Sequence, residues 1–264
     1  GTGELILHAI EHGYREFIIG IGGSATNDAG LGMLQALGFR FYDQNGEILG
    51  KGGQILDQIV AIDFSSVHPA LKDARFTIAC DVRNPFSGPE GAAYVFARQK
   101  GADGAMIEKL DAGMKRFSRL IHSTTGREIT EVAGAGAAGG LGGAFLAFLN
   151  AELKPGIELL LRTLKFDEKI KDADLIITGE GRVDRQSVMG KVPFGILEEA
   201  NKQGIPVIVV AGSIADTEVL NKAGFRGIFS IVPSPMSLEV AMKPEAAKNN
   251  ISRTVAQIIS LATL

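Results

Sequence analysis

Glycines and short polar side chains are concentrated in one run near the start of the chain, Gly20–Gly30. Glycine lets a backbone approach a ligand closely, and free amide groups at the start of a helix attract anions. A plain connecting loop rarely needs both glycines and a cluster of hydroxyl, amide and carboxyl side chains. The run therefore predicts a cradle for a phosphate or carboxylate group. Its candidate residues are Gly22, Gly23, Ser24, Thr26, Asn27 and Asp28.

The same run permits two other interpretations. Gly20, Gly22 and Ala25 fit the pattern G-x-G-x-x-A, and Asp43 lies near the end of the next expected strand. A dinucleotide-binding fold places its ribose-binding acid there, so an NAD-dependent oxidoreductase is an alternative. The polar insert Ser24–Asp28 does not belong to that fingerprint, and glycine-rich chains match the pattern by chance. A purely structural turn is the remaining interpretation.

A second glycine run contains a literal G-x-G-x-x-G at Gly134, Gly136 and Gly139. No convincing strand precedes it, and no acid follows at the distance that the dinucleotide fingerprint requires. Close packing of small residues at a helix start and a ligand-facing loop are both open here. The pattern G-x-x-x-x-G-K-[ST] is missing from the sequence, which excludes a P-loop enzyme at the level of the motif.

A third group of candidate residues follows an apolar strand expected at Leu175–Thr178. Ligands of open parallel sheets bind at the carboxyl ends of the strands, where Gly179 and Gly181 are expected. Carboxylates there can hold Mg²⁺ or act as a general base, and a lysine can meet a phosphate. The alternative is a solvated loop with ordinary surface charges. The candidates with these roles are Glu180 and Asp184 (Mg²⁺ or base), Lys191 (phosphate) and Ser187 (phosphate).

Asp81 and Arg83 form a further candidate, just beyond a strand expected at Ala74–Ala79. Arginine pairs with carboxylates through two hydrogen bonds, so this pair of residues is suited to a small carboxylate ligand. An ion pair between Asp81 and Arg83 explains the pattern equally well. Cys80 follows an apolar segment and is expected to pack rather than to act as a nucleophile.

Composition narrows the class of protein. The chain has 27 basic and 30 acidic residues, a net charge of −3, and no run of Lys or Arg, which argues against nucleic acid as a partner. No apolar stretch approaches the roughly 20 residues of a membrane helix. The single cysteine excludes an internal disulfide and indicates a reducing, cytoplasmic location. We therefore expect small molecules as partners.

The order of expected elements predicts an α/β protein. A helical stripe is expected at 5–10, a strand at Glu16–Ile21, and a turn at Asn45–Gly46. Beyond about residue 166, strands and helices alternate at short spacing, which is typical of β-α-β units and a parallel sheet. Asp103 is expected to cap a helix whose apolar face comprises Met106, Leu110, Met114, Phe117 and Ile121.

Several segments, in order and spacing, resemble the glycerate kinase type 1 family, the bacterial glycerate 2-kinases. Each motif alone is modest, but the ordered set is specific and runs through almost the whole chain. The matching segments are Gly1–Leu5, Gly20–Gly38, Cys80–Ala92 with Gln99–Ala102, Gly134–Gly143 and Ala173–Lys191.

The resemblance implies an enzyme that uses Mg²⁺ and transfers the γ-phosphoryl group of ATP to D-glycerate, with 2-phosphoglycerate as the favoured product. It also implies two α/β domains, one Rossmann-like with a parallel sheet and one an inserted mixed-sheet domain, with the active site in the cleft between them. Residues 1–165 would form most of the inserted domain, and residues 166–264 the C-terminal part of the Rossmann-like domain.

Under this resemblance, Gly22–Asp28 would cradle phosphate or glycerate, and Arg83 would hold the carboxylate. Asp184 or Glu180 would bind Mg²⁺ or take the hydroxyl proton, and Lys191 would neutralise developing charge. Family members carry a further N-terminal segment with Asp-Ser-Phe-Lys and Ala-Asp-Gly-Gly-Glu-Gly stretches, and neither occurs here. A non-catalytic fragment of the kinase, able to associate through an open sheet edge, is therefore a further alternative.

Overall fold

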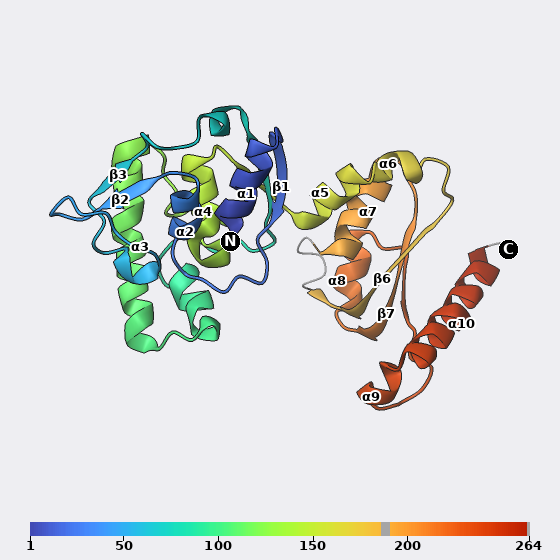
Figure 1. The fold of residues 1–264 in the computed structure, drawn as a ribbon. Coiled ribbons are helices and arrows are strands. Elements are labelled where there is room, and N and C mark those ends of the chain that lie inside the picture. Colours follow the sequence, from blue (N-terminus) through green and yellow to red (C-terminus); the bar gives the residue numbers. More distant parts are fainter. Residues whose placement is uncertain (186–190, 263–264) are drawn as a thin grey trace. The chain divides into compact units, whose positions relative to one another are not determined.

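The computed structural model describes residues 1–185 and 191–262, which divide into two compact units, Gly1–Gly156 and Ile157–Leu264. Each unit has a three-stranded parallel sheet with helices packed against it, which confirms the α/β class (Figure 1). Assignment of the units to an inserted and a Rossmann-like domain stays a prediction. Within the described residues, no helix has both the length and the apolar character needed to cross a membrane.

The sheet of the first unit has the order β1-β4-β5. Its strands are β1 (Glu16–Gly20), β4 (Arg75–Ala79) and β5 (Glu152–Lys154). Gly20 lies opposite Ala79, and Ala79 lies opposite Lys154. Because all three strands run in parallel, their carboxyl ends meet at one edge of the sheet. The segments that leave these ends contain the first glycine run and Cys80–Arg83.

Two short strands, β2 (Arg40–Tyr42) and β3 (Ala61–Asp63), form a separate antiparallel pair. The expected turn after β2 is present: Tyr42 bridges to Ile48, and Gly46 adopts a φ of +79°. This left-handed conformation suits glycine and explains why the Asn45–Gly46 pair marks the turn. The first unit thus contains both parallel and antiparallel pairing.

The helices of the first unit surround this framework. They are α1 (Thr2–Glu11), α2 (Leu31–Ala36), α3 (Gly104–Thr125) and α4 (Ala137–Phe148), with the short helical segments η1 (Gly53–Ile55), η2 (Pro69–Asp73), η3 (Ala93–Ala97) and η4 (Arg98–Lys100).

Helix α3 begins as the sequence predicts, because the Asp103 carboxylate accepts a hydrogen bond from the Met106 amide at 2.8 Å. Three members of its expected apolar face, Met114, Phe117 and Ile121, are buried. Met106, at the start of that face, is instead 55% exposed and lines a surface hollow beside Lys100.

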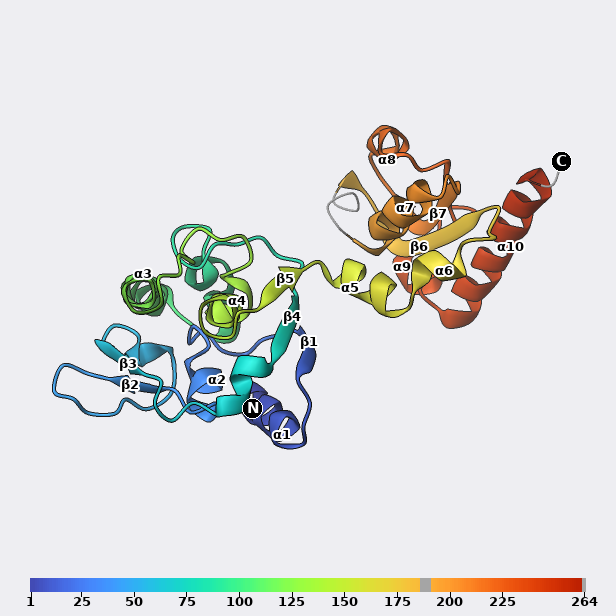
Figure 2. The ribbon, with the colours of Figure 1, turned by 90° about the horizontal axis from the view of Figure 1, so that it is seen from above.

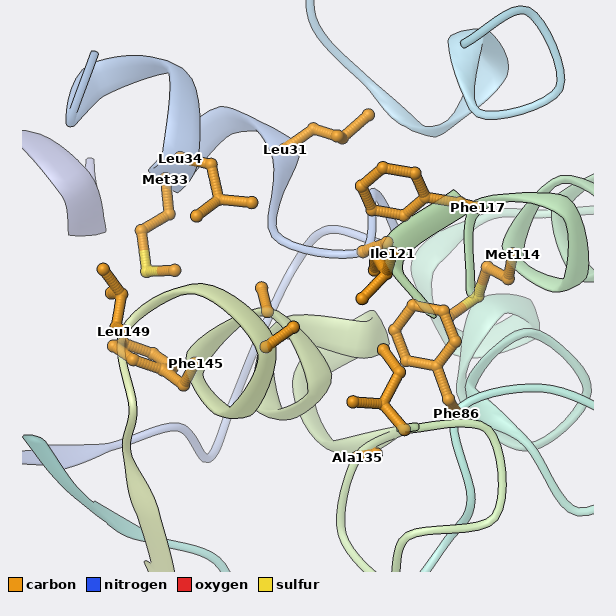
Figure 3. Close-up of a cluster of buried hydrophobic side chains, with 14 of the residues drawn as sticks. Leu31, Met33, Leu34, Phe86, Met114, Phe117, Ile121, Ala135, Phe145 and Leu149 are labelled. Atoms are coloured by element: carbon orange, nitrogen blue, oxygen red, sulfur yellow. The ribbon is translucent and has the colours of Figure 1, made fainter. Parts of the chain in front are cut away.

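The core of the first unit includes buried side chains from several of its helices and strands, and α3 and α4 are prominent among them. Figure 3 shows Phe86 and Met114 close together, with Phe145 on α4. Gly143 of α4 allows this packing, since an added Cβ would lie 2.5 Å from the Phe86 ring. The missing side chain at Gly143 therefore lets the Phe86 ring pack directly against α4.

The second unit has the sheet order β6-β7-β8, and all pairs are parallel. Its strands are β6 (Ile176–Val183), β7 (Val207–Ile214) and β8 (Gly227–Ser230). Its helices are α5 (Gly156–Thr163, which begins at the unit boundary), α6 (Phe166–Lys169), α7 (Val192–Lys202), α8 (Thr217–Ala223), α9 (Leu238–Ala241) and α10 (Pro244–Ala262).

Helices cover both faces of this sheet (Figure 2). Val207 and Val209 pack with Leu197 of α7 and Leu220 of α8 on one face. Ile208 and Val210 alternate with them and pack with Ile258 of α10 on the other. This alternation is the two-residue period of a strand buried on both faces, as βα units require.

Candidate functional site

A cavity of about 240 Å³ lies at the carboxyl edge of the β1-β4-β5 sheet. We call it the sheet-edge cavity. Ligands of parallel α/β sheets bind at this kind of edge. Its lining comes from the segments after β1 and β4, from the η3–η4 region and from the start of α4: Ile21, Gly22, Gly23, Ser24, Ala79, Cys80, Asp81, Val82, Phe96, Gln99, Ala137 and Ala138.

The backbone at Gly22 and Gly23 is open toward this space. An added Cβ at either position would meet no atom within 4 Å. Within the described part of the chain, the amide groups of these two residues have no hydrogen-bond partner. Gly23 has a φ of +68°, so the turn itself favours glycine. Unpaired amides beside an open cavity are suited to bind a phosphate or carboxylate oxygen.

The other end of the loop is fixed by close packing. An added Cβ at Gly53 would collide with the Asn27 carbonyl, and one at Gly139 would collide with the Thr26 carbonyl. The Ala29 amide also donates to the Gly139 carbonyl at 2.9 Å. Gly139 of the second glycine run therefore serves close packing, whereas Ala137 and Ala138 of that run line the sheet-edge cavity.

Lys100 ties this loop to the end of η4. Its Nζ donates to Ser24 Oγ at 2.8 Å and to the Thr26 carbonyl at 2.6 Å. Burial lowers the pKa of the Lys100 ammonium, and the nearby Asp28 carboxylate opposes that shift. Residue-type reasoning did not select Lys100 as a site residue. Its only sequence signal is its place in the Gln99–Ala102 segment of the family resemblance.

Asp28 is engaged in the start of α2. Its Oδ1 accepts from the Gly30 amide at 3.0 Å, and its Oδ2 accepts from the Gly32 amide at 3.1 Å. Both carboxylate oxygens therefore satisfy amides at the helix start. Thr26, Asn27 and Asp28 line neighbouring hollows rather than the sheet-edge cavity. Of the predicted cradle, the structure brings Gly22, Gly23 and Ser24 to that cavity.

Asp81 joins these three residues, but Arg83 does not. Asp81 lines the sheet-edge cavity, and its Oδ1 accepts from the Gly156 amide at 2.8 Å. Arg83 is exposed and lies outside the lining. Within the described residues, no ion pair joins Asp81 to Arg83, so that explanation of the motif is not supported.

Cys80 also lines the sheet-edge cavity, and its Sγ lies 3.3 Å from the Val82 carbonyl. Burial raises the pKa of the Cys80 thiol, with a smaller opposing effect from the hydrogen bond to Val82. A raised pKa keeps the thiol protonated near neutral pH, which is the opposite of what a cysteine nucleophile needs.

The dinucleotide interpretation is wrong for this fold. Asp43 follows β2, and β2 pairs with β3 in a sheet that does not contain β1. The Asp43 Oδ1 accepts from the amides of Asn45 at 2.8 Å and Glu47 at 2.9 Å. Asp43 is therefore the organising residue of a turn, in the manner usual for Asp at such positions, and not the acid at the end of the neighbouring parallel strand.

In the second unit, strand β6 is longer than the strand that the sequence predicts at Leu175–Thr178. β6 continues to Val183, with Glu180 opposite Ala211, so Gly179, Glu180 and Gly181 lie within the strand rather than beyond it. An added Cβ at Gly179 would lie 2.7 Å from the Val210 carbonyl, so this glycine allows β6 and β7 to approach. Asp184 directly follows the strand.

Charged groups cluster at this carboxyl end. Arg182 Nε donates to Asp184 Oδ2 at 3.0 Å, and the Arg185 amide donates to Asp216 Oδ2 at 3.2 Å. Lys191 is exposed and immediately precedes α7. The predicted phosphate ligand Ser187 lies outside the described residues.

The possible metal ligands near the carboxyl end of β6 are a few carboxylates. Among the described residues, no group of three or more His, Cys, Asp or Glu side chains is arranged to hold a metal ion. Mg²⁺ typically binds one or two carboxylates and completes its octahedron with water and substrate phosphates. Glu180 and Asp184 thus stay predicted Mg²⁺ ligands.

Comparison with known proteins places this chain among kinases of a small organic acid. The sequence model of the glycerate kinase family matches residues 1–263. A glycerate kinase of Halalkalibacterium halodurans is 46% identical over 258 residues, which cover 96% of this chain and 68% of the relative. A glycerate 2-kinase of Escherichia coli K12 is 48% identical over 254 residues, which cover 96% of this chain and 66% of the relative.

A solved structure agrees with these matches. The crystal structure of a provisionally assigned glycerate kinase 2 from Salmonella typhimurium LT2 superposes with a TM-score of 0.82 at 42% sequence identity. The superposed region covers 100% of this chain and 69% of the crystallised chain. The chain thus spans about two thirds of the length of the proteins it matches.

Proposed function

Because the chain belongs to the glycerate kinase family, we propose that it transfers the γ-phosphoryl group of ATP to D-glycerate. The observation that carries this proposal is the match to named glycerate kinases over nearly the whole chain. Phosphoryl transfer depends mainly on positioning and on neutralising charge. Open backbone amides, carboxylates and lysines at the ends of parallel strands supply groups for both purposes.

In the first unit, the sheet-edge cavity is our proposed site for the glycerate carboxylate or for a phosphate. The amides of Gly22 and Gly23 and the hydroxyl of Ser24 would bind the anionic oxygens. Asp81 uses Oδ1 for the Gly156 amide, and we assign Oδ2 to accept a hydrogen bond from a hydroxyl group of glycerate. Thr26, Asn27, Asp28 and Arg83 remain predicted ligand residues without a place in this cavity.

In the second unit, we propose that Glu180 or Asp184 binds Mg²⁺ or accepts the proton of the reacting hydroxyl. Bound Mg²⁺ would neutralise phosphate charge, which is its general contribution to phosphoryl transfer. Lys191 would add a further positive charge, and Gly179, Gly181 and Ser187 complete the predicted phosphate site. Asp184 directly follows β6, at the edge where ligands of such sheets bind.

The acceptor position and the location are part of the proposal. We assign the 2-hydroxyl as phosphoryl acceptor, in keeping with the name of the Escherichia coli relative. A cytoplasmic location is consistent with one cysteine that is half-buried and unpaired. Small molecules, ATP and D-glycerate, are the partners that we propose, together with a second copy of this chain.

The test is to incubate the protein with ATP, Mg²⁺ and D-glycerate and to follow phosphoglycerate by ³¹P NMR, which also separates the 2- and 3-phosphorylated products. Formation of 2-phosphoglycerate is the expected result. Mg²⁺ omission with added chelator is the control for the metal. Formation of 3-phosphoglycerate would overturn the assignment of the acceptor hydroxyl.

Binding of D-glycerate, measured by calorimetry, without any turnover would overturn the proposed phosphoryl transfer. A folded protein that shows neither turnover nor binding of D-glycerate would overturn the proposed substrate as well.

A further inference from the structure

We propose that Lys100 is a positioning residue of the anion site, which fixes the Ser24–Thr26 segment and directs the Ser24 hydroxyl proton toward the sheet-edge cavity. The inference rests on the proposed function in one respect, namely that the cavity binds a carboxylate or phosphate. Lys100 itself does not line that cavity, so it would act through Ser24 and not by contact with the ligand.

The hydrogen-bond roles follow from the chemistry of the two groups. A lysine ammonium has three donors and no acceptor, whereas a serine hydroxyl has one donor and two acceptor lone pairs. At the 2.8 Å contact, Ser24 Oγ must therefore accept from Lys100 Nζ. The hydroxyl proton is left to point elsewhere, and Ser24 lines the sheet-edge cavity. An anion in the cavity would be the natural acceptor.

The second bond of Lys100 gives this orientation its stiffness. Nζ also donates to the Thr26 carbonyl at 2.6 Å, so one ammonium holds two points of the loop. Gly53 and Gly139 confine the Thr26–Asn27 backbone from other sides. The loop is thus held before any ligand arrives, which reduces the ordering that binding would otherwise require.

Electrostatics strengthen the proposed donor. Hydrogen bonds with an ionised partner are shorter and stronger than neutral ones, and a chain of such bonds polarises its members. The Lys100 ammonium makes Ser24 a better donor to an anion. Burial lowers the pKa of the Lys100 ammonium, and the nearby Asp28 carboxylate opposes that shift and favours the charged form.

The proposal predicts coupling between Lys100 and Ser24 that a purely structural lysine would not show. We would measure binding of inorganic phosphate and of D-glycerate by calorimetry in wild type, Lys100→Met, Ser24→Ala and the double variant. Each single change should weaken binding by about tenfold, the order expected for a hydrogen bond to a charged group. The double variant should bind no more weakly than Ser24→Ala. The proposal would be overturned if Lys100→Met weakened binding equally in the wild-type protein and in the Ser24→Ala variant.

Controls separate local from general effects. Lys109 lines the same surface hollow as Lys100, and its one ion pair with the described residues is a 3.9 Å contact with Asp57, so Lys109→Met should leave binding unchanged. Lys100→Arg, which keeps a donor and a charge, should recover part of the lost affinity. Urea unfolding of each variant checks that the fold is intact.

A readout without ligand keeps this inference distinct from the proposed function. Hydrogen exchange followed by mass spectrometry should show faster exchange of the Ala25–Asp28 amides in Lys100→Met and no change in Lys109→Met. Unchanged exchange in Lys100→Met would overturn the positioning role. If wild type binds neither phosphate nor D-glycerate, the anion site of the proposed function fails, and the exchange result alone decides whether Lys100 fixes the loop.

Discussion

The Asp81 carboxylate accepts a hydrogen bond from the Gly156 amide at 2.8 Å, which ties the segment after β4 to the segment after β5. These residues are far apart in the sequence but adjacent at the carboxyl edge of one parallel sheet. Asp81 also lines the sheet-edge cavity. One oxygen therefore has a structural partner, while the side chain as a whole faces the proposed ligand.

Substitution of Asp81 should separate these two functions. Asp81→Asn keeps an oxygen acceptor for the Gly156 amide but replaces the second oxygen by a donor, so stability should be nearly unchanged. Binding of D-glycerate should weaken by about tenfold, because a hydroxyl of the ligand loses its acceptor. Asp81→Ala should in addition lower the free energy of unfolding by about 1 kcal/mol in urea titrations.

Inorganic phosphate is the matched ligand for this experiment, since its binding does not depend on donating a sugar-acid hydroxyl to Asp81. Asp81→Asn should therefore bind phosphate at least as well as wild type. Loss of phosphate and D-glycerate binding to the same extent would contradict the assigned role of Asp81.

Cys80 offers a direct report on occupancy of the cavity, because it is the single cysteine of the chain and lines that space. Burial raises the pKa of its thiol, and the thiolate is the reactive form. Alkylation by iodoacetamide at neutral pH should therefore be slower than in the urea-unfolded chain. The pH at which the alkylation rate reaches half of its maximum should be higher for Cys80 than for an exposed thiol, as measured by mass spectrometry.

D-glycerate should slow this alkylation further in proportion to the occupied fraction of the site. D-lactate, which has the same configuration at C2 but lacks the terminal hydroxyl, is the control and should protect more weakly. Alkylation as fast as in unfolded chain and insensitive to D-glycerate would contradict the placement of the ligand beside Cys80.

Sequence reasoning located both strand-end segments, because the alternation of short apolar runs with helical stripes is a local signal. It failed where pairing between strands determines how long a strand is or which sheet it joins. β6 extends to Val183 because its ladder with β7 continues to Ile214, which no local pattern around Thr178 reveals. Asp43 matched a fingerprint by spacing alone, but the strand that it follows, β2, pairs with β3 (Ala61–Asp63) and not with β1.

The candidate site shows the same limit. Ser24 and Asp28 are close in sequence and equally polar, yet one lines the cavity and the other caps α2. Lys100 bonds to Ser24 from a segment 76 positions away, so its role depends on a tertiary contact. Residue type and spacing identified the loop, while the direction of each side chain required the fold.

Asp43 should contribute to stability in a pH-dependent way. Hydrogen bonds from the Glu47 backbone, and then from Asn45, lower the pKa of the Asp43 carboxyl below its ordinary value of 3.8. A lowered folded-state pKa gives stability that is fully present above the ordinary value and lost as pH falls through the folded-state value. Asp43→Ala should therefore be less stable than wild type at neutral pH, with the difference shrinking in acid.

Thermal unfolding across pH 2–7 would measure this trend, with Glu47→Gln as the matched change in the same turn. The Glu47 side chain makes no hydrogen bond or ion pair with the described residues, so Glu47→Gln should follow wild type throughout. A constant gap between Asp43→Ala and wild type down to the acid limit would contradict the role of the ionised carboxylate.

The two glycine runs should respond in opposite ways to alanine. At Gly139, a Cβ would collide with the Thr26 carbonyl, and the φ of +70° is left-handed. The left-handed conformation costs an L-residue about 1–2 kcal/mol, and overpacking adds about 1–3 kcal/mol. Gly139→Ala should lose stability on that scale in urea unfolding.

At Gly22, a Cβ meets nothing within 4 Å, so Gly22→Ala should stay within about 0.5 kcal/mol of wild type. Its methyl group would instead occupy the open side of the amide and weaken phosphate binding measured by calorimetry. A stable Gly139→Ala, or a Gly22→Ala that binds phosphate as wild type does, would show that the packed and open sides of the loop are assigned wrongly.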